Sequence, residues 1–319
     1  MLAPMNMIDF GGNQARGPDV PGEVCLITIS YRGDFELARD LCASIDRFAH
    51  PDIEHILVVP RSDLSLFSPL VTGSRRLIAV ESVLPKGYVR LPLPRHIAIG
   101  SYRRLIREIW WGPTGIVRGW IVQQILKLSA PAITRRDVVV FADSDIVLVR
   151  PVSTSLFTGE TGVRLYRVRG ATENSAMHQK WHTVSARLLG LESKPYFGAD
   201  YIGNLISWRR DVILQLQARL TSLAGKRWDK IVARQTAFSE YILYGIFAEH
   251  VLGPSHCEHF PTSEDLVHAG WHYALTAPAG LDEFVQGFEP HHVGVAIQST
   301  ERFTVDERRL LIQRTVNSD

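Results

Sequence analysis

In the first half of the chain, short continuous runs of apolar residues alternate with amphipathic stretches. Strands that read as unbroken apolar runs are typical of a parallel sheet buried on both faces and joined by right-handed helical crossovers. The pattern therefore predicts an α/β fold in which helices flank a mainly parallel sheet. The apolar runs cover residues 24–30, 54–60, 76–81 and 138–142, and the helical patterns cover 34–48 and 119–130.

The pattern changes after residue 150, where shorter apolar runs mix with helical periods. The predicted strands are 164–169 and 201–208, and the predicted helices are 173–189, 211–223 and 236–247. Open parallel sheets bind ligands at the carboxyl ends of their strands. We therefore expect the ligand site at these strand ends, and a flexible N-terminus (1–22) followed by two halves (23–150 and 151–319) of the same domain.

Composition places the chain among ordinary globular proteins, with 45% hydrophobic and 21% charged residues. A net charge of +2 gives no reason to expect nucleic acid as a partner. Three cysteines without regular spacing, no export signal and no apolar run of bilayer length predict a cytoplasmic protein. Peripheral contact with the inner membrane surface stays open, because Arg103, Arg104 and Arg107 precede Trp110 and Trp111.

The chemistry centres on Asp143-Ser144-Asp145, directly after the most apolar run. Residues i and i+2 of an extended segment point the same way, so both carboxylates can meet one cation. Mg²⁺ and Mn²⁺ prefer oxygen ligands and leave positions for substrate phosphates. The alternative is a turn in which the aspartates only cap backbone N–H groups. We favour a metal site for Mn²⁺ or Mg²⁺ formed by Asp143 and Asp145.

The segment FADSDIVLVRPVSTSLF resembles the Asp-x-Asp segment of GT-A glycosyltransferases, including the glycogenin-like and bacterial lipopolysaccharide galactosyltransferases. Three later segments keep the order seen in those families: YFGADYIGNLISW (196–208), TAFSEYILY (236–244) and PHHVGVAIQS (290–299). The GW-x-x-QQ helix before the motif is similar to that of an uncharacterised group of bacterial GT-A-like proteins. The chain departs from the glycogenin pattern, because it lacks Lys-Pro-Trp after His-x-x-Gly and begins its acidic helix with Ser-Glu.

This resemblance implies that the exit of the first strand cradles the nucleotide, with Tyr31 stacking on the base and Asp34 binding an N–H. The residues concerned are Ser30, Tyr31, Arg32 and Asp34, although an ordinary turn with a helix cap at Asp34 explains the same pattern.

One helix before the metal motif, Gln123 and Lys127 share a face at i, i+4 spacing and are assigned to the donor with Asp143. The same spacing also suits a solvated helix face. The resemblance implies that Glu240 and Asp200 are the catalytic or sugar-binding acids. It also makes His292 the third metal ligand, with a core histidine as the alternative.

The function that this resemblance implies is a metal-dependent hexosyltransferase of bacterial polysaccharide biosynthesis, with 23–150 as its nucleotide-sugar-binding half and 151–319 as its acceptor-binding half. It would move a sugar from a nucleoside diphosphate sugar, UDP-sugar favoured, to a saccharide or lipid-linked glycan. One alternative is a haloacid-dehalogenase-like phosphatase with a nucleophilic first Asp. Such enzymes place the motif near the domain start and follow it with Gly-Thr, where this chain has Ile146-Val147. Another alternative is a non-catalytic sugar-binding module on the same scaffold.

A zinc site is a weaker alternative for the second half of the chain. Its ligands would come from His256, Cys257, Glu258 and His259, completed by His268 or His272. The spacing matches no standard structural zinc pattern.

Overall fold

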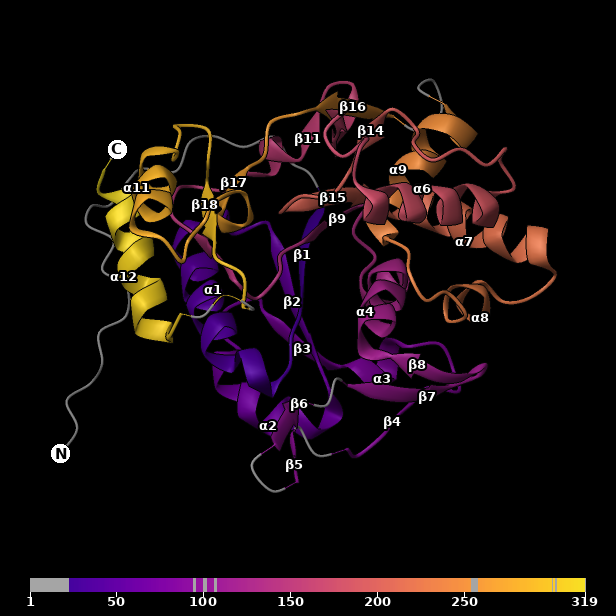
Figure 1. Cartoon of the computed structure of the whole chain (residues 1–319), viewed down its shortest axis with the longest axis horizontal. Helices are drawn as coiled ribbons and strands as arrows, with labels where there is room; N and C mark the ends of the chain where they lie inside the picture. Colours follow the sequence, from indigo (N-terminus) through magenta and orange to yellow (C-terminus); the bar gives the residue numbers. More distant parts are fainter. Residues whose placement is uncertain are drawn as a thin grey trace.

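The computed structural model describes residues 23–93, 96–99, 102–105, 108–253, 258–299, 301 and 303–318. The expected flexible segment 1–22 lies outside this range. A five-stranded sheet of order β15-β9-β1-β2-β3 forms the centre (Figure 1). The four predicted apolar runs form its parallel strands, and only β15 is antiparallel, which confirms the α/β class with a mainly parallel sheet. The bounds are β1 Val24–Ile29, β2 Glu54–Val59, β3 Arg76–Ala79, β9 Val138–Phe141 and β15 Ile206–Arg209.

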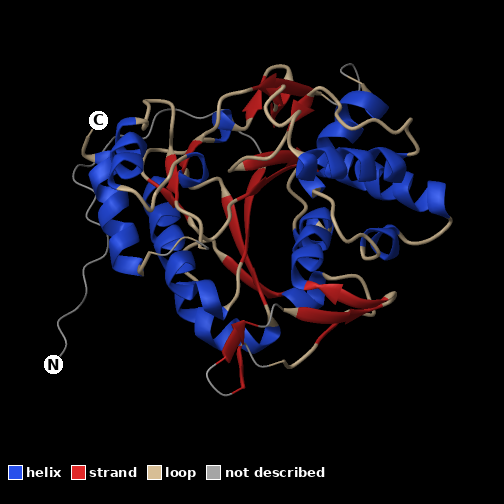
Figure 2. Ribbon diagram, in the orientation of Figure 1, coloured by secondary structure: helices blue, strands red, loops and turns tan. Residues whose placement is uncertain are grey.

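Two apolar cores cover the two faces of this sheet. Cys25 and Ile27 of β1 belong to the core shared with α4 (Gly119–Leu128) and α9 (Glu240–Ile246). Val24 and Leu26 belong to the core under α1 (Phe35–Phe48). Figure 2 shows α1 on one side of the sheet and α4 on the other. Because successive side chains of each strand enter opposite cores, the strands read as continuous apolar runs.

The predicted helices are found with small shifts in their ends, except that the last begins only at Glu240 and continues as a π-helix, Phe247–Leu252. No helix of the described ranges is both long and apolar enough to span a bilayer. The remaining helices are α2 Leu64–Phe67, α3 Val80–Val83, α5 Ala130–Ile133, α6 Ala176–Leu189, α7 Arg210–Ala224, α8 Trp228–Val232, α11 Pro278–Gln286 and α12 Val305–Val316.

Small sheets surround the central one. Two predicted strands are corrected: the run 164–169 divides between β12 and β13, and the run 201–208 is a strand only from Ile206, in the central sheet. The residue before it, Leu205, adopts a left-handed backbone (φ 47°). The Pro- and Gly-rich stretch after β3 contains strands that the sequence did not predict. The bounds are β4 Val89–Arg90, β5 His96–Ile99, β6 Tyr102–Leu105, β7 Ile109–Gly112, β8 Gly115–Arg118, β10 Ile146–Leu148, β11 Thr158–Gly159, β12 Gly162–Tyr166, β13 Val168–Arg169, β14 Ala199–Asp200, β16 His259–Thr262, β17 Val267–Ala269 and β18 Gly294–Ala296.

A buried ion pair fastens α12 to α1. The Arg309 guanidinium donates two hydrogen bonds, of 2.8 and 2.9 Å, to the Asp40 carboxylate, and both side chains are 7% exposed. Arg309→Met leaves Asp40 buried without this partner, so we expect the free energy of unfolding to fall by about 3–5 kcal/mol. Urea denaturation measures this change, and Asp40→Leu/Arg309→Met should recover much of the loss. A change in Arg309→Met below about 1 kcal/mol would show that the pair contributes little.

Stability should also fall in mild acid because of His182 in α6. Its ring is buried between Tyr196 and Phe197, and neither ring nitrogen has a hydrogen-bond partner among the described residues. Burial lowers the pKa of His182 from 6.5 to about 4. The folded chain therefore binds fewer protons than the unfolded chain between these values, and stability decreases as the pH falls through them.

At pH 5 the loss from this residue should be on the order of 1 kcal/mol relative to pH 7. His182→Phe, which keeps an aromatic ring in the core, should remove that part of the pH dependence. Urea unfolding of both proteins at pH 7 and pH 5 gives the comparison. An unchanged pH dependence in the variant would assign the effect to other groups.

Candidate functional site

The paired aspartates lie at the carboxyl end of β9. The strand ends at Phe141, and the Ile146 N–H donates to the Asp143 carbonyl at 3.1 Å, closing a turn that leads into β10. The Asp143 side chain is 52% exposed, whereas Asp145 is partly buried. Solvent therefore reaches the motif from the side of Asp143.

The order of the strands makes this edge the expected ligand site of the sheet. The chain starts at β1, adds β2 and β3 on one side, and then places β9 on the other side of β1. In open α/β sheets, a crevice forms outside the carboxyl ends of the two strands where the winding reverses. Those strands are β1 and β9, and the Ser144 hydroxyl donates to the Ser30 hydroxyl at 2.9 Å. The first-strand exit and the aspartate motif thus meet at this crevice.

The exit of β1 continues as an extended segment before its helix. Ser30 is buried, and its N–H donates to the carbonyl of Val58 in β2. The ring of Tyr31 covers Gly33, where an added Cβ would lie 2.4 Å from the ring. Glycine at position 33 therefore allows the ring to lie across the exit loop. The predicted base contacts of Tyr31 and Asp34 stay predictions.

Arg32 is engaged by the exit of the neighbouring strand. Its backbone N–H and its Nε each donate to the buried Asp63 carboxylate at 2.8 Å. Burial raises the pKa of Asp63, but the hydrogen bonds from Arg32 outweigh it and hold the pKa below its usual value. The pair ties the exits of β1 and β2 together, and most of the Arg32 side chain remains accessible.

Lys127 of α4 links the motif to a buried acid. Its Nζ lies 3.2 Å from Glu240 Oε1 and 3.5 Å from Asp143 Oδ1, and it donates to the Tyr241 hydroxyl at 2.6 Å. Burial lowers the pKa of Lys127, but Asp143, Tyr241 and Glu240 outweigh it and hold the pKa well above its usual value. Lys127 is therefore protonated at neutral pH, and its ammonium group lies between Asp143 and Glu240.

Glu240 is the first residue of α9 and is buried. The rings of Tyr241 and Tyr244 pack on Trp208 of β15, with centroids 5.7 and 4.5 Å apart. These contacts fix the start of α9 over the sheet. A buried carboxylate requires a charged or hydrogen-bonding partner, and Lys127 is that partner.

Of the two residues predicted on α4, the structure places Lys127 beside Asp143. Gln123 is exposed, whereas Gln124 is buried and accepts the Glu240 N–H through its Oε1 at 3.1 Å. Trp120 of the same helix is 43% exposed. The helix is buried around most of its circumference, so a single apolar stripe does not describe it. Gln124 is a residue that the sequence reading missed, and the role of Gln123 stays a prediction.

The pKa of Asp145 is set by burial and by the charges of Asp143 and of Arg308 in the C-terminal helix. Burial, reinforced by the charge of Asp143, raises the pKa of Asp145 to about 6, although Arg308 of α12 acts in the opposite direction. Arg308 is itself buried and donates to the Gln298 carbonyl at 2.7 Å. Burial lowers the pKa of Arg308, and Asp145 and Asp34 oppose that effect. Sequence reading missed Arg308, because its position beside the motif arises only from the docking of α12.

Asp200 has a full set of partners. Its Oδ1 accepts the N–H groups of Tyr201 and Ile202, and its Oδ2 accepts the Thr172 hydroxyl at 2.8 Å. The His178 Nδ1 also lies 2.8 Å from Oδ2. These contacts hold the turn after β14. The predicted catalytic role of Asp200 is untested, and its geometry is that of a residue that shapes the loop.

The structure places His292 away from the two aspartates. Antiparallel pairing of β18 with β10 brings the Ser299 N–H to Asp145 Oδ2 at 3.3 Å. His292 lies at the other end of this strand pair, where its carbonyl accepts a hydrogen bond from Arg150. At the usual rise per residue of a β-strand, positions 145 and 150 are on the order of 15 Å apart. Its Nδ1 accepts the Glu289 N–H at 2.8 Å. The expectation that His292 completes the metal site is therefore corrected by the strand register.

The zinc alternative gains no support from the described residues. His256 and Cys257 lie outside them, and the His268 Nε2 is 2.7 Å from the Phe284 carbonyl. Nowhere in the described ranges do three His, Cys, Asp or Glu side chains form a group that could hold a metal ion.

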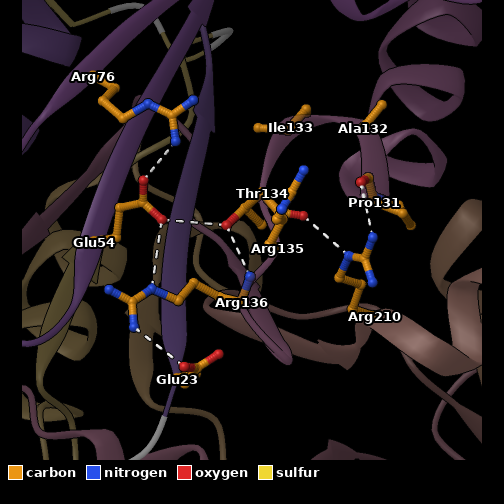
Figure 3. Close-up of a pocket in the computed structure, with 10 residues that line it drawn as sticks. All are labelled: Glu23, Glu54, Arg76, Pro131, Ala132, Ile133, Thr134, Arg135, Arg136 and Arg210. Atoms are coloured by element: carbon orange, nitrogen blue, oxygen red, sulfur yellow. Dashed lines mark hydrogen bonds and ion pairs between the residues drawn. The ribbon is translucent and has the colours of Figure 1, made fainter.

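A polar cavity at the opposite edge of the sheet is a separate feature (Figure 3). Glu54 and Arg76 begin the parallel strands β2 and β3, so they mark the amino ends. The side chains in Figure 3 turn toward one another: Arg76 and Thr134 donate to Glu54 at 2.7 and 3.2 Å, and Arg210 donates to the Thr134 carbonyl at 3.1 Å. Their polar groups are largely satisfied within the cavity wall.

The aspartate pair suits a divalent cation. Both side chains offer carboxylate oxygens, the ligands that Mg²⁺ and Mn²⁺ prefer. The raised pKa of Asp145 reflects burial and the like charge of Asp143, and a divalent cation would relieve that repulsion. Two protein ligands leave the other coordination positions for substrate oxygens or water.

The sequence matches a model of one protein family over residues 24–308. That model is described as a family of unknown function, DUF6492. The chain belongs to this family. The match extends from the first residue of β1 to Arg308, so it includes every segment of the candidate site. No curated protein matches the sequence.

The chain is also similar to solved glycosyltransferases. An active-site mutant of LgtC has 12% identity and a TM-score of 0.46, with 92% of this chain and 96% of LgtC covered. The galactosyltransferase LgtC in complex with donor and acceptor sugar analogues has 16% identity and a TM-score of 0.44, with the same coverage. GlyE of Streptococcus pneumoniae has 13% identity and a TM-score of 0.45, with 92% of this chain but 63% of GlyE covered.

Proposed function

We propose that the chain is a metal-dependent glycosyltransferase of the hexosyltransferase type. It would move a sugar from a nucleoside diphosphate sugar, with UDP favoured, to a saccharide or lipid-linked glycan acceptor. The observation that carries the proposal is the meeting of Asp143 and Asp145 with the β1 exit at the strand ends where the winding of the sheet reverses. A buried acid and a lysine lie at the same place.

In this proposal residues 23–150 bind the donor. Asp143 and Asp145 would hold Mn²⁺ or Mg²⁺, and the bound ion supplies positive charge for the donor diphosphate. Ser30, Tyr31, Arg32 and Asp34 would surround the nucleotide. The Lys127 ammonium, held beside Asp143, and the buried Arg308 guanidinium place further positive charge at the two ends of the motif.

Residues 151–319 would form the acceptor side, with Glu240, which shares Lys127 with Asp143, as its acid. Lys127 and the Gln124 contact hold Glu240 at the start of α9. In an inverting transferase its carboxylate would accept the proton of the attacking hydroxyl. In a retaining transferase it would stabilise positive charge on the donor sugar. Asp200 is the second candidate, because its oxygens are already engaged by the loop.

We also place this reaction in bacterial polysaccharide biosynthesis, in the cytoplasm or at the inner membrane surface. Cys25 and Cys42 are free and buried, as expected of thiols in a reducing compartment.

The product of donor turnover separates this function from its alternatives. The protein is incubated with nucleoside diphosphate sugars and Mn²⁺, and the released groups are identified. A transferase releases nucleoside diphosphate from these donors, whereas a haloacid-dehalogenase-like phosphatase would release inorganic phosphate from a phosphate monoester, such as p-nitrophenyl phosphate, offered in a parallel assay. A sugar-binding module would release neither, and either of these last two outcomes would overturn the proposal.

A further inference from the structure

An apolar row crosses the outer face of the small sheet β4-β7-β8. The strand register pairs Val89 with Trp111 and Trp111 with Ile116, so the three side chains lie side by side. Their exposed fractions are 60%, 54% and 68%. Arg118 lies two residues after Ile116 in β8 and pairs with Ile109 of β7. The exposed Arg118 side chain is therefore on the same face as Ile116. We call Val89, Trp111, Ile116 and Arg118 the hairpin face.

The opposite side of this sheet is anchored in the protein core. Tyr88, Trp110 and Val117 are buried and belong to the core cluster shared with α4. Figure 1 shows the β7–β8 hairpin projecting beside α4, away from the central sheet. Because the inner side of this sheet packs on the core, the strand register keeps the side chains of the hairpin face on the solvent side.

Charge is concentrated in the same part of the sequence. Residues 84–120 contain seven Lys or Arg residues and one Glu, a net charge of +6, although the whole chain carries only +2. The rest of the chain is therefore net acidic. Four of the seven, Arg95, Arg103, Arg104 and Arg107, have side chains outside the described ones. Of the other three, Arg90 pairs with the one acid, Glu108, at 2.6 Å, while Lys86 and Arg118 are exposed.

We propose that the hairpin face docks on a membrane surface that carries anionic lipids. Tryptophan side chains favour the boundary between lipid and water, and basic residues are attracted to anionic headgroups. A face that combines exposed apolar side chains with an exposed arginine, within a segment of net positive charge, is typical of peripheral attachment. A second copy fits less well, because a symmetric contact through this face would bring the exposed Arg118 side chains of the two copies together. The proposal does not depend on the transferase activity.

Sedimentation with vesicles tests this surface. Wild-type protein should pellet with phosphatidylcholine vesicles that contain phosphatidylglycerol, much less with phosphatidylcholine alone, and less again at high salt. Trp111→Ser/Ile116→Ser should bind anionic vesicles about tenfold more weakly. Leu214→Ser/Leu223→Ser is the matched control, because it removes two exposed apolar side chains of α7 and should bind like wild type. Both variants alter exposed residues, and circular dichroism with thermal melts checks that they fold.

Three results would overturn the proposal. The first is no pelleting of wild type with anionic vesicles, and the second is equal pelleting of the Trp111→Ser/Ile116→Ser variant. The third is a wild-type dimer without lipid that the same variant dissociates, because it would assign the hairpin face to a second copy. Loss of turnover with unchanged vesicle binding would bear only on the proposed function, so the two proposals fail separately.

Discussion

Replacing Asp145 by alanine should abolish metal-dependent binding of a nucleoside diphosphate while leaving the fold intact. Asp145 is one of the two carboxylates that would hold the cation, and a single remaining ligand binds such ions poorly. Burial and Asp143 raise the pKa of Asp145 to about 6, so its charge opposes folding at neutral pH. The truncation should therefore leave the melting temperature close to that of wild type.

Calorimetric titration of UDP in the presence of Mn²⁺ measures this effect. Asp137→Ala is the matched control, because Asp137 is an exposed aspartate just before the start of the same strand, β9. It should bind UDP like wild type. Binding by Asp145→Ala within about twofold of wild type would rule out the aspartate pair as the metal site.

Glu240→Gln should lower turnover by about a hundredfold or more and leave nucleotide binding in place. The amide keeps the size of the side chain but cannot accept a proton or supply a full negative charge. Nucleotide affinity should persist, because the aspartate motif and the β1 exit carry it. Steady-state kinetics should thus show the loss in kcat, with little change in UDP affinity by titration. Glu283→Gln, an exposed acid of α11, serves as the control.

A structural role for Glu240 makes a different prediction. If the residue only balances Lys127, then Glu240→Gln will destabilise the fold and retain near-normal kcat. Lys127→Met and the double variant complete a double-mutant cycle, which measures how much the Lys127–Glu240 interaction contributes to the free energy of unfolding. Near-normal kcat in a folded Glu240→Gln variant would remove it from the reaction and turn attention to Asp200.

The central sheet could be predicted because both of its faces are buried. Strands such as β1 and β9 send successive side chains into two apolar cores, and this leaves unbroken apolar runs in the sequence. The position of Asp143 and Asp145 followed from the end of such a run. The strands β4 and β7 could not be found in this way, because they are short and expose one face.

The rest of the site depends on contacts between distant segments. Lys127 meets Glu240 because α9 packs across α4, and neither helix records this in its own pattern. Gln124 could not be singled out from the sequence, because α4 is buried on most sides and no single apolar stripe marks the face that meets Glu240. The register of β10 and β18 places His292 far from Asp145 and places Ser299 next to Asp145. Such registers are set by tertiary packing.

The most direct test of a metal-held nucleoside diphosphate is the thermal unfolding of the unmodified protein with UDP, in Mn²⁺ and in excess chelator. A ligand at a hundred times its Kd adds about 2.7 kcal/mol to the stability of the folded state. We predict that UDP raises the melting temperature in Mn²⁺ and leaves it unchanged in chelator. A shift of equal size in chelator, or no shift with any nucleoside diphosphate in Mn²⁺, would contradict the account.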